Sequence, residues 1–217
     1  MLESMIAIQK NISVEDIDIS EQEFEECGSA ESRNTCFGVD NASPINRVIN
    51  CGGQKPTGSK LFSEKSYPYD VKQNLKHIED CKYNKKQDKD VIANVKGVKG
   101  KNGRWQVRHL LDKTERGLKS AVQEIGPVSV GMSWPSPIRI KSDGPDVKCN
   151  KTIGGHAAVV IGWGSDKEGE YWLVKSSWGE GWPPHPEKGE GKGVGKMSKY
   201  LGLACGIAST GVTADIA

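Results

Sequence analysis

The sequence predicts an α+β fold of two lobes, because patterns typical of helices dominate its first part and patterns typical of strands dominate its second. We expect a helical lobe over about 1–88 and a β-rich lobe over about 89–217. Hydrophobic residues make up 35% of the 217 residues, and 26 glycines raise the apolar share to an ordinary globular value. A chain of this length and composition can bury a core.

Three segments predict the helical part. Apolar residues recur at helical spacing over residues 2–8, which predicts a helix at the start of the chain. The stretch Ser20–Glu23 is a capping box and predicts a short helix that ends at about Cys27. Ser43-Pro44 predicts another helix start, because proline suits the first helical position. The Gly-, Lys- and Thr-rich residues 52–59 predict a loop.

The second part contains mostly strand patterns. Residues 91–98 alternate as in a strand, whereas Thr114–Ile125 places its apolar residues on one face and predicts a helix ended by Gly126-Pro127. The chain between Pro183 and Gly195 is crowded with Pro, Gly, Lys and Glu and predicts a loop. Four further strands are predicted, at Pro127–Met132, Ala157–Trp163, Tyr171–Lys175 and Gly193–Lys199.

Charge and hydropathy exclude several classes of protein. The net charge of +2 gives no reason to expect a nucleic acid or an anionic membrane as partner. No stretch is long and apolar enough to cross a bilayer. The N-terminal stretch MLESMIAIQKN is too short and too polar for a secretory signal peptide.

The cysteines are widely spaced and form no CxxC pair, which argues against a zinc cage. They suggest an oxidising compartment, with buried, reduced cysteines in a cytosolic protein as the alternative. The triplets Asn11-Ile12-Ser13 and Asn150-Lys151-Thr152 are N-glycosylation sequons and fit a secreted chain. We interpret His77 and His185 as solvated histidines, so neither a metal nor a cofactor is expected. The six cysteines are Cys27, Cys36, Cys51, Cys81, Cys149 and Cys205.

The strongest functional signal comes from two neighbouring stretches, Ile153–Gly164 and Tyr171–Trp182. The first places His156 at the mouth of an apolar run, and the second ends an apolar run in small polar residues and tryptophans. An imidazole beside such runs is typical of one half of a nucleophilic active site.

Together with other motifs, these stretches resemble the papain-type, cathepsin-like cysteine peptidases. The matching pieces follow the family order nearly end to end: Leu2-Glu3-Ser4, Ile19–Cys27, Ser66–Tyr69, Gly126–Val130, Gly155-His156-Ala157, Gly162-Trp163-Gly164, Tyr171–Lys175, Ser177-Trp178-Gly179 and Cys205–Ala208.

The resemblance implies a papain-like fold with a helical left lobe, a β-barrel-like right lobe and a cleft between them. It implies a peptide or protein substrate in that cleft and hydrolysis through a thiolate that an imidazole activates. It also implies a monomer without a cofactor, in a lysosome or outside the cell.

Several site residues follow from the resemblance. His156 matches the family histidine, and Ser176 stands where the family has the asparagine that orients it. Because a serine hydroxyl is shorter and would need a shifted backbone or a water to reach the ring, we expect this orienting function to be lost. Trp178 and Trp182 match tryptophans that cover the site and line the leaving-group side, although packing alone would also explain them.

Besides Trp178 and Trp182, four residues are expected to bind substrate. The family's Cys-Asn-Gly-Gly strand appears here as Cys36–Val39, so Gly38 and Val39 would border the substrate backbone, and Val39 adds a side chain where the family has glycine. Gly131 and Ala157 would line the main specificity pocket.

The nucleophile is harder to place. Cys27 precedes His156 by a family-like interval, but the polar residues 30–34 that follow it cannot form a buried central helix. Cys27 also matches a disulfide cysteine, so we keep it only as the less favoured alternative. Met1–Ser4 matches a later part of the central helix, so we expect the left lobe to be truncated before the nucleophile and the oxyanion glutamine.

The resemblance implies the disulfides Cys27–Cys81 and Cys149–Cys205. Cys36 and Cys51 stay unassigned, and a bond between them has no support. Three interpretations of function follow: an incomplete cysteine peptidase that is inactive as written, which we favour; a catalytically dead relative that binds peptides or proteases; and a purely structural secreted protein.

Overall fold

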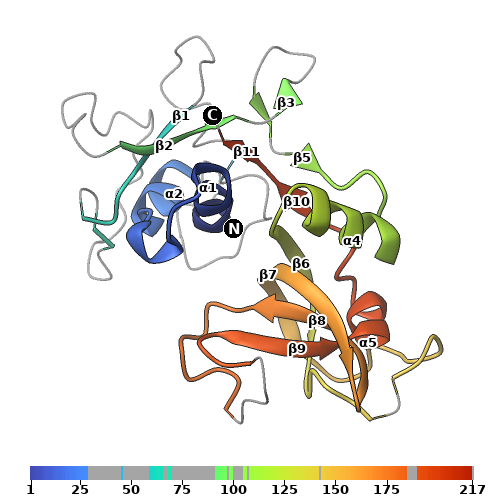
Figure 1. Ribbon diagram of the computed structural model, residues 1–217. Helices are drawn as coiled ribbons and strands as arrows, with labels where there is room; N and C mark the ends of the chain where they lie inside the picture. The colour runs from blue at the N-terminus through green and yellow to red at the C-terminus, as the bar shows by residue number, and fades with distance from the viewer. Residues whose placement is uncertain are drawn as a thin grey trace. The chain divides into compact units, whose positions relative to one another are not determined.

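A computed structural model describes residues 1–28, 45, 59–65, 68–69, 91–96, 98–99, 105–106, 108–141, 143–184 and 190–216 (Figure 1). The chain divides into two compact units. The first unit comprises Leu2–Arg108 and Ala214–Ala217, and the second unit comprises His109–Thr213 with Met1.

The observed division differs from the expected one after residue 88. Strand β2 (Val91–Lys96) pairs with β1 (Ser59–Phe62) on one side and with β11 (Asp215–Ile216) on the other. Residues 91–108 therefore stay with the first unit, and the C-terminal end of the chain returns to it. Alternation along the sequence predicts a strand but does not say which sheet the strand joins.

The first unit begins with the helices that the sequence predicts. Helix α1 (Leu2–Lys10) buries its apolar stripe, and α2 (Glu21–Gly28) follows the short 3₁₀ helix η1 (Val14–Asp16). The Ser20 hydroxyl accepts a hydrogen bond from the Glu23 amide at 3.1 Å, so the predicted capping box starts α2. Of the helix predicted after Ser43-Pro44, the structure describes Ile45, which is helical. A small ladder joins β3 (Val98–Lys99) to β4 (Trp105–Gln106).

The second unit is built on a six-stranded sheet with the order β5-β10-β6-β7-β8-β9. Helix α4 (Glu115–Glu124) starts at Thr114, whose hydroxyl accepts a hydrogen bond from the Gly117 amide. A six-residue helix, α5 (Lys199–Ala204), directly follows the strand that ends at Ser198. The strands are β5 (Arg108–His109), β6 (Val128–Pro135), β7 (Thr152–Asp166), β8 (Gly169–Lys175), β9 (Val194–Ser198) and β10 (Val212–Thr213).

The core of the second unit lies between this sheet and its two helices. Every second residue of β6 is buried, as expected for a strand with one face on the core. Each fully buried apolar side chain stabilises the unit by about 1.5–3 kcal/mol relative to an exposed one. The buried set includes Leu118, Ala121, Val128, Val130, Met132, Trp134, Trp172, Val174, Met197 and Leu201.

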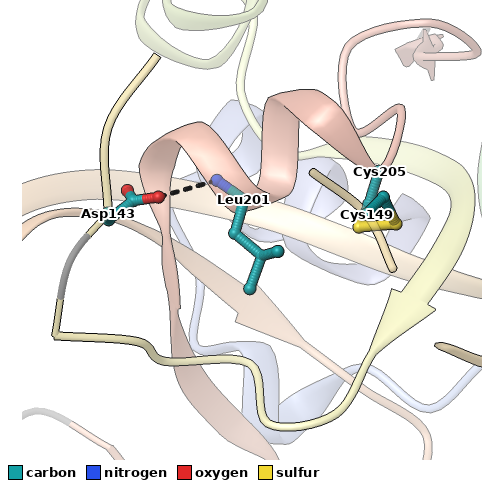
Figure 2. The surroundings of a disulfide bond; sticks show 4 residues. All are labelled: Asp143, Cys149, Leu201 and Cys205. Atoms are coloured by element: carbon teal, nitrogen blue, oxygen red, sulfur yellow. Dashed lines mark hydrogen bonds between the residues drawn. A yellow bond between two sulfur atoms is a disulfide. The ribbon is translucent and has the colours of Figure 1, made fainter. Parts of the chain in front are cut away.

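Helix α5 is anchored at both ends (Figure 2). The Asp143 carboxylate accepts hydrogen bonds from the amides of Tyr200 at 2.8 Å and Leu201 at 2.9 Å. At the other end, Cys205 forms a disulfide with Cys149 across 56 residues of sequence, which is the pair that the family resemblance implies. By the chain-entropy model, closing a loop of this length stabilises the fold by about 4 kcal/mol.

The strands predicted in the second part are all present, and three of them, β6, β7 and β8, are longer than predicted. β6 continues three residues past Met132, and β7 begins five residues before Ala157. The predicted loop from Pro183 ends where β9 begins at Val194. Several predicted residues lie outside the described part of the chain: Cys36, Gly38, Val39, Cys51, His77, Cys81, His185 and the side chain of Cys27.

Candidate active site

His156 lies on β7, where the β6–β7 register sets its position. It pairs directly with Met132, and the next residue, Ala157, pairs with Gly131. The imidazole is half-buried. Strand pairing therefore fixes the backbone beneath the ring, which a rigid catalytic group requires.

Ser176 contacts the imidazole directly. Its hydroxyl oxygen lies 3.0 Å from Nε2 of His156, and its side chain is buried. The Ser176 hydroxyl therefore reaches the ring directly, without a bridging group. The β7–β8 register pairs Val159 with Lys175, and the Ser176 amide donates to the Gly193 carbonyl at 2.9 Å. These long-range contacts hold the hydroxyl beside the ring.

Serine and asparagine would restrain the imidazole differently. An asparagine carbonyl oxygen only accepts a hydrogen bond, so it selects a ring with a proton on the facing nitrogen. A hydroxyl can donate or accept, so Ser176 can hold either tautomer. Among the described residues, Nδ1 of His156 has no hydrogen-bond partner, which leaves that nitrogen available for proton transfer.

Two tryptophans contact the imidazole, and a third packs against both of them. Trp178 stacks on His156 with ring centroids 4.6 Å apart and an interplanar angle of 23°. Trp134 meets the ring edge-on at 4.7 Å and 83°. Trp182 completes the cluster, with its centroid 5.8 Å from those of both other tryptophans. Such aromatic contacts contribute about 0.5–1.5 kcal/mol each beyond the area that they bury.

Trp134 is the site residue that the sequence reasoning missed. It is only 1% exposed, whereas Trp178 is 44% exposed. The alternation of the strand could have indicated it, because Trp134 follows Val130 and Met132 on the buried face of β6. The predicted strand ended at Met132, before the alternation reached the tryptophan.

Among the described residues, the ring of His156 contacts indole rings and the Ser176 hydroxyl. Burial lowers the pKa of His156 below its ordinary value, because desolvation disfavours the imidazolium. At neutral pH the ring is therefore neutral, which is the form that can accept a proton from a nucleophile.

The pair expected to line the specificity pocket lies beside the imidazole. Gly131 and Ala157 face each other across β6 and β7. The Thr210 hydroxyl accepts from the Gly131 amide at 2.8 Å and donates to the Gly131 carbonyl at 2.7 Å. Thr210 therefore occupies the outer edge of β6 at this point. The other two predicted substrate residues, Gly38 and Val39, lie outside the described residues.

The described side chains include two cysteines, Cys149 and Cys205, and these are joined in the disulfide. Within the same described ranges, no group of three or more His, Cys, Asp or Glu side chains is arranged to hold a metal ion. No helix in the described part of the chain is long and apolar enough to cross a membrane.

The chain matches relatives of one kind. It is 32% identical over 200 residues to cathepsin L1 of Drosophila melanogaster, covering 89% of this chain and 45% of the relative. It is 28% identical over 196 residues to digestive cysteine proteinase 3 of Homarus americanus, covering 89% of this chain and 51% of the relative. The chain thus spans about half the length of these relatives.

Solved structures show the same fold. A digestive procathepsin L 3 from the larval midgut of Tenebrio molitor superposes with a TM-score of 0.65 at 24% identity, covering 97% of this chain and 59% of that one. Bromelain from Ananas comosus in complex with the E64 inhibitor gives 0.63 at 22% identity, covering 99% and 84%. The family model described as papain family cysteine protease matches residues 1–214. The chain therefore belongs to the papain family of cysteine proteases and has its α+β fold.

Proposed function

We propose that this chain carries the imidazole half of a peptide-hydrolysing site and that residues 1–217 by themselves do not turn over peptides. The observation that carries the proposal is the contact of 3.0 Å between His156 Nε2 and Ser176 Oγ inside a tryptophan cluster. In this proposal His156 is the general base and acid, and Ser176 is its positioning residue.

The chemistry of such a site follows from the free nitrogen of the ring. Nδ1 of His156 would take the proton of a cysteine thiol, and the thiolate would attack the scissile carbonyl carbon. The carbon–nitrogen bond then breaks, and the imidazolium returns the proton to the leaving amine. Water, deprotonated by the same ring, hydrolyses the thioester and restores the thiol.

The absence of turnover rests on the cysteines. The two described cysteine side chains form a disulfide and are not thiols. Cys27 is followed by a polar stretch unlike the helix that bears the family nucleophile. Removing the nucleophile of such a unit costs about 10⁶-fold in rate, even when the base is intact.

The same geometry supports peptide binding without cleavage as a second candidate function. Trp178 is 44% exposed and stacked on His156, so its outer surface can contact a ligand on what the resemblance makes the leaving-group side. We propose peptides or proteins as ligands, with Gly131 and Ala157 lining the specificity pocket and Gly38 and Val39 beside the peptide backbone. The disulfide supports a lysosomal or extracellular location.

The test compares the full chain with bromelain as an active control. Both proteins are given fluorogenic peptides and then E64, and E64 adducts are measured by intact mass. We expect turnover and an adduct for bromelain only, with the chain at least about 10⁵-fold slower. An E64 adduct on any cysteine of the chain, together with turnover, would overturn the proposal.

Binding is measured separately on the same material. Addition of a peptide that this chain binds should change the fluorescence of the exposed Trp178, and the change should be absent in W178F. A saturable change in both proteins would show that the peptide binds elsewhere.

A further inference from the structure

We propose that Asn150 is the acceptor of an N-linked glycan. The sequon Asn150-Lys151-Thr152 lies in the second unit, between the disulfide cysteine Cys149 and the start of β7. All three of its residues are exposed. This modification goes beyond the peptidase chemistry and does not depend on it.

The fold makes no other use of the two side chains that define this sequon. Neither the side-chain amide of Asn150 nor the Thr152 hydroxyl makes a hydrogen bond to a described residue. The backbone here is nevertheless held: the Asn150 amide donates to the Lys148 carbonyl at 3.0 Å, and the Lys151 carbonyl accepts from the Ser136 amide at 2.9 Å. The backbone is thus fixed while the acceptor side chain stays free.

The other sequon, Asn11-Ile12-Ser13, has a structural explanation. Asn11 follows α1 with a φ of 51°, a left-handed conformation that asparagine tolerates better than most residues, and the Ile12 amide closes the helix on the Ala7 carbonyl at 3.1 Å. The Ser13 hydroxyl caps η1 by accepting from the Glu15 amide at 3.2 Å. Helix ends account for both polar residues there, and no such role accounts for Asn150 and Thr152.

A second observation adjoins the sequon in the chain. Cys149 immediately precedes Asn150 and is bonded to Cys205. Disulfides form and persist in oxidising compartments such as the secretory pathway, where sequons of exported proteins receive glycans. The segment 149–152 therefore contains a disulfide-bonded cysteine and a sequon, and both are typical of proteins from the secretory pathway.

The transfer is chemically simple. Nδ2 of Asn150 forms a bond to C1 of the first sugar of a lipid-linked diphospho-oligosaccharide. The bond between C1 and the diphosphate oxygen breaks, the lipid diphosphate leaves, and one amide proton is lost to solvent. No residue of this chain needs to be oxidised or reduced.

The glycan would stand apart from the imidazole. Thr152 is the first residue of β7, and His156 follows on the same strand. At about 3.3 Å per residue, the four-residue step from Thr152 to His156 spans about 13 Å of the strand. We therefore expect removal of the glycan to leave peptide binding at His156 unchanged, so a failure of this inference is distinguishable from a failure of the proposed function.

The experiment secretes the full chain from a eukaryotic host in an N11Q background, so that any glycan signal reports Asn150. Treatment with peptide N-glycosidase F should increase the gel mobility of this protein and leave a labelled aspartate at position 150 when done in heavy-oxygen water. N150Q should lose the mobility shift completely.

A matched pair of variants separates the sequon from the fold. T152S keeps an acceptor sequon and should keep the shift. T152V retains the branched side chain at the position paired with Pro135 but should lose the shift. Secreted protein with an unmodified Asn150 in both the N11Q parent and T152S would overturn the proposal, as would an equal shift in T152V.

Discussion

The two ends of the β7–β8 hairpin in the second unit have opposite electrostatic characters. At one end, His156 lies among indole rings and one hydroxyl. At the other end, Asp166 binds both Arg139 at 2.8 Å and Lys196 at 3.0 Å. The two ends are about 30 Å apart along β7. One strand thus carries a site that can change its charge near neutral pH at one end and an ion-paired carboxylate at the other.

The charged end continues onto the helices. Lys199, at the start of α5, binds Glu170 of β8 and lies 3.5 Å from Glu115 of α4. Burial lowers the pKa of Lys199, but the hydrogen bonds to Glu170 and Tyr200 outweigh it and raise that pKa above its ordinary value. For Asp166, burial raises the pKa, but the hydrogen bonds from Lys196 and the Glu168 amide and the charges of Arg139 and Lys196 together outweigh it, so the pKa lies below its usual value.

The contrast has a chemical reason. A general base must change its charge near the working pH, and at His156 desolvation favours the neutral form that can accept a proton. A scaffold ion pair works in the opposite way, because each charge stabilises its partner. The same sheet therefore holds a histidine among tryptophans, where its charge can change, and a lysine among carboxylates, where its charge is stabilised.

The largest expected effect comes from W134A. Trp134 is almost fully buried and contacts His156, Trp178 and Trp182, so its removal leaves a cavity beneath the imidazole. We expect a loss of about 3–5 kcal/mol in the free energy of unfolding, measured by urea denaturation. W178A is the matched control and should lose less, because that ring is half-exposed. Equal losses in the two variants would contradict the claim that the buried Trp134 supports the site more than the half-exposed Trp178 does.

A smaller effect is expected from K199M at the charged end. The substitution removes the ammonium between Glu170 and Glu115 while keeping an unbranched side chain. Breaking a fully buried pair costs about 3–5 kcal/mol, and because Glu170 is partly exposed we expect about 2 kcal/mol in the free energy of unfolding. K113M, on an exposed loop residue, should stay within about 0.5 kcal/mol of the parent. A stable K199M would show that the pairs contribute little.

The smallest effect distinguishes the two ends by pH. His156 has a lowered pKa in the folded state, so the unfolded chain binds more protons in acid. Its contribution to stability is complete above about pH 6.5, falls as the pH falls from there through the lowered folded-state value, and then levels off. H156Q should remove this dependence, and H109Q, at an exposed histidine, should keep it.

Asp166 should respond in a separate range. Its folded-state pKa is also lowered, but for an acid this means stability that is present above about pH 3.8 and lost as the pH falls through the folded value. D166N should therefore alter the acid limb and leave the region near pH 6 unchanged. Urea denaturation across pH measures both limbs, and removal of the same limb by both variants would contradict two independent ends.

Local patterns accounted for most elements and for part of the site. Helical spacing, a capping box and alternation correctly located α1, α2, α4 and four of the six strands of the large sheet, β6 to β9, because each depends on neighbours within about four residues. The motifs around His156 and Trp178 placed the chain in its family, and the comparisons confirmed that family. Resemblance also indicated the pair Cys149 and Cys205, which the structure joins.

Contacts between distant residues required the folded structure. The Ser176 hydroxyl reaches His156 through a strand register and a hydrogen bond to Gly193, and Trp134 enters the site from a neighbouring strand. The return of β11 to β2 likewise moved the boundary between the units. Side-chain periodicity repeats within a few residues, whereas strand pairing joins residues tens of positions apart, so no local pattern encodes which partners meet.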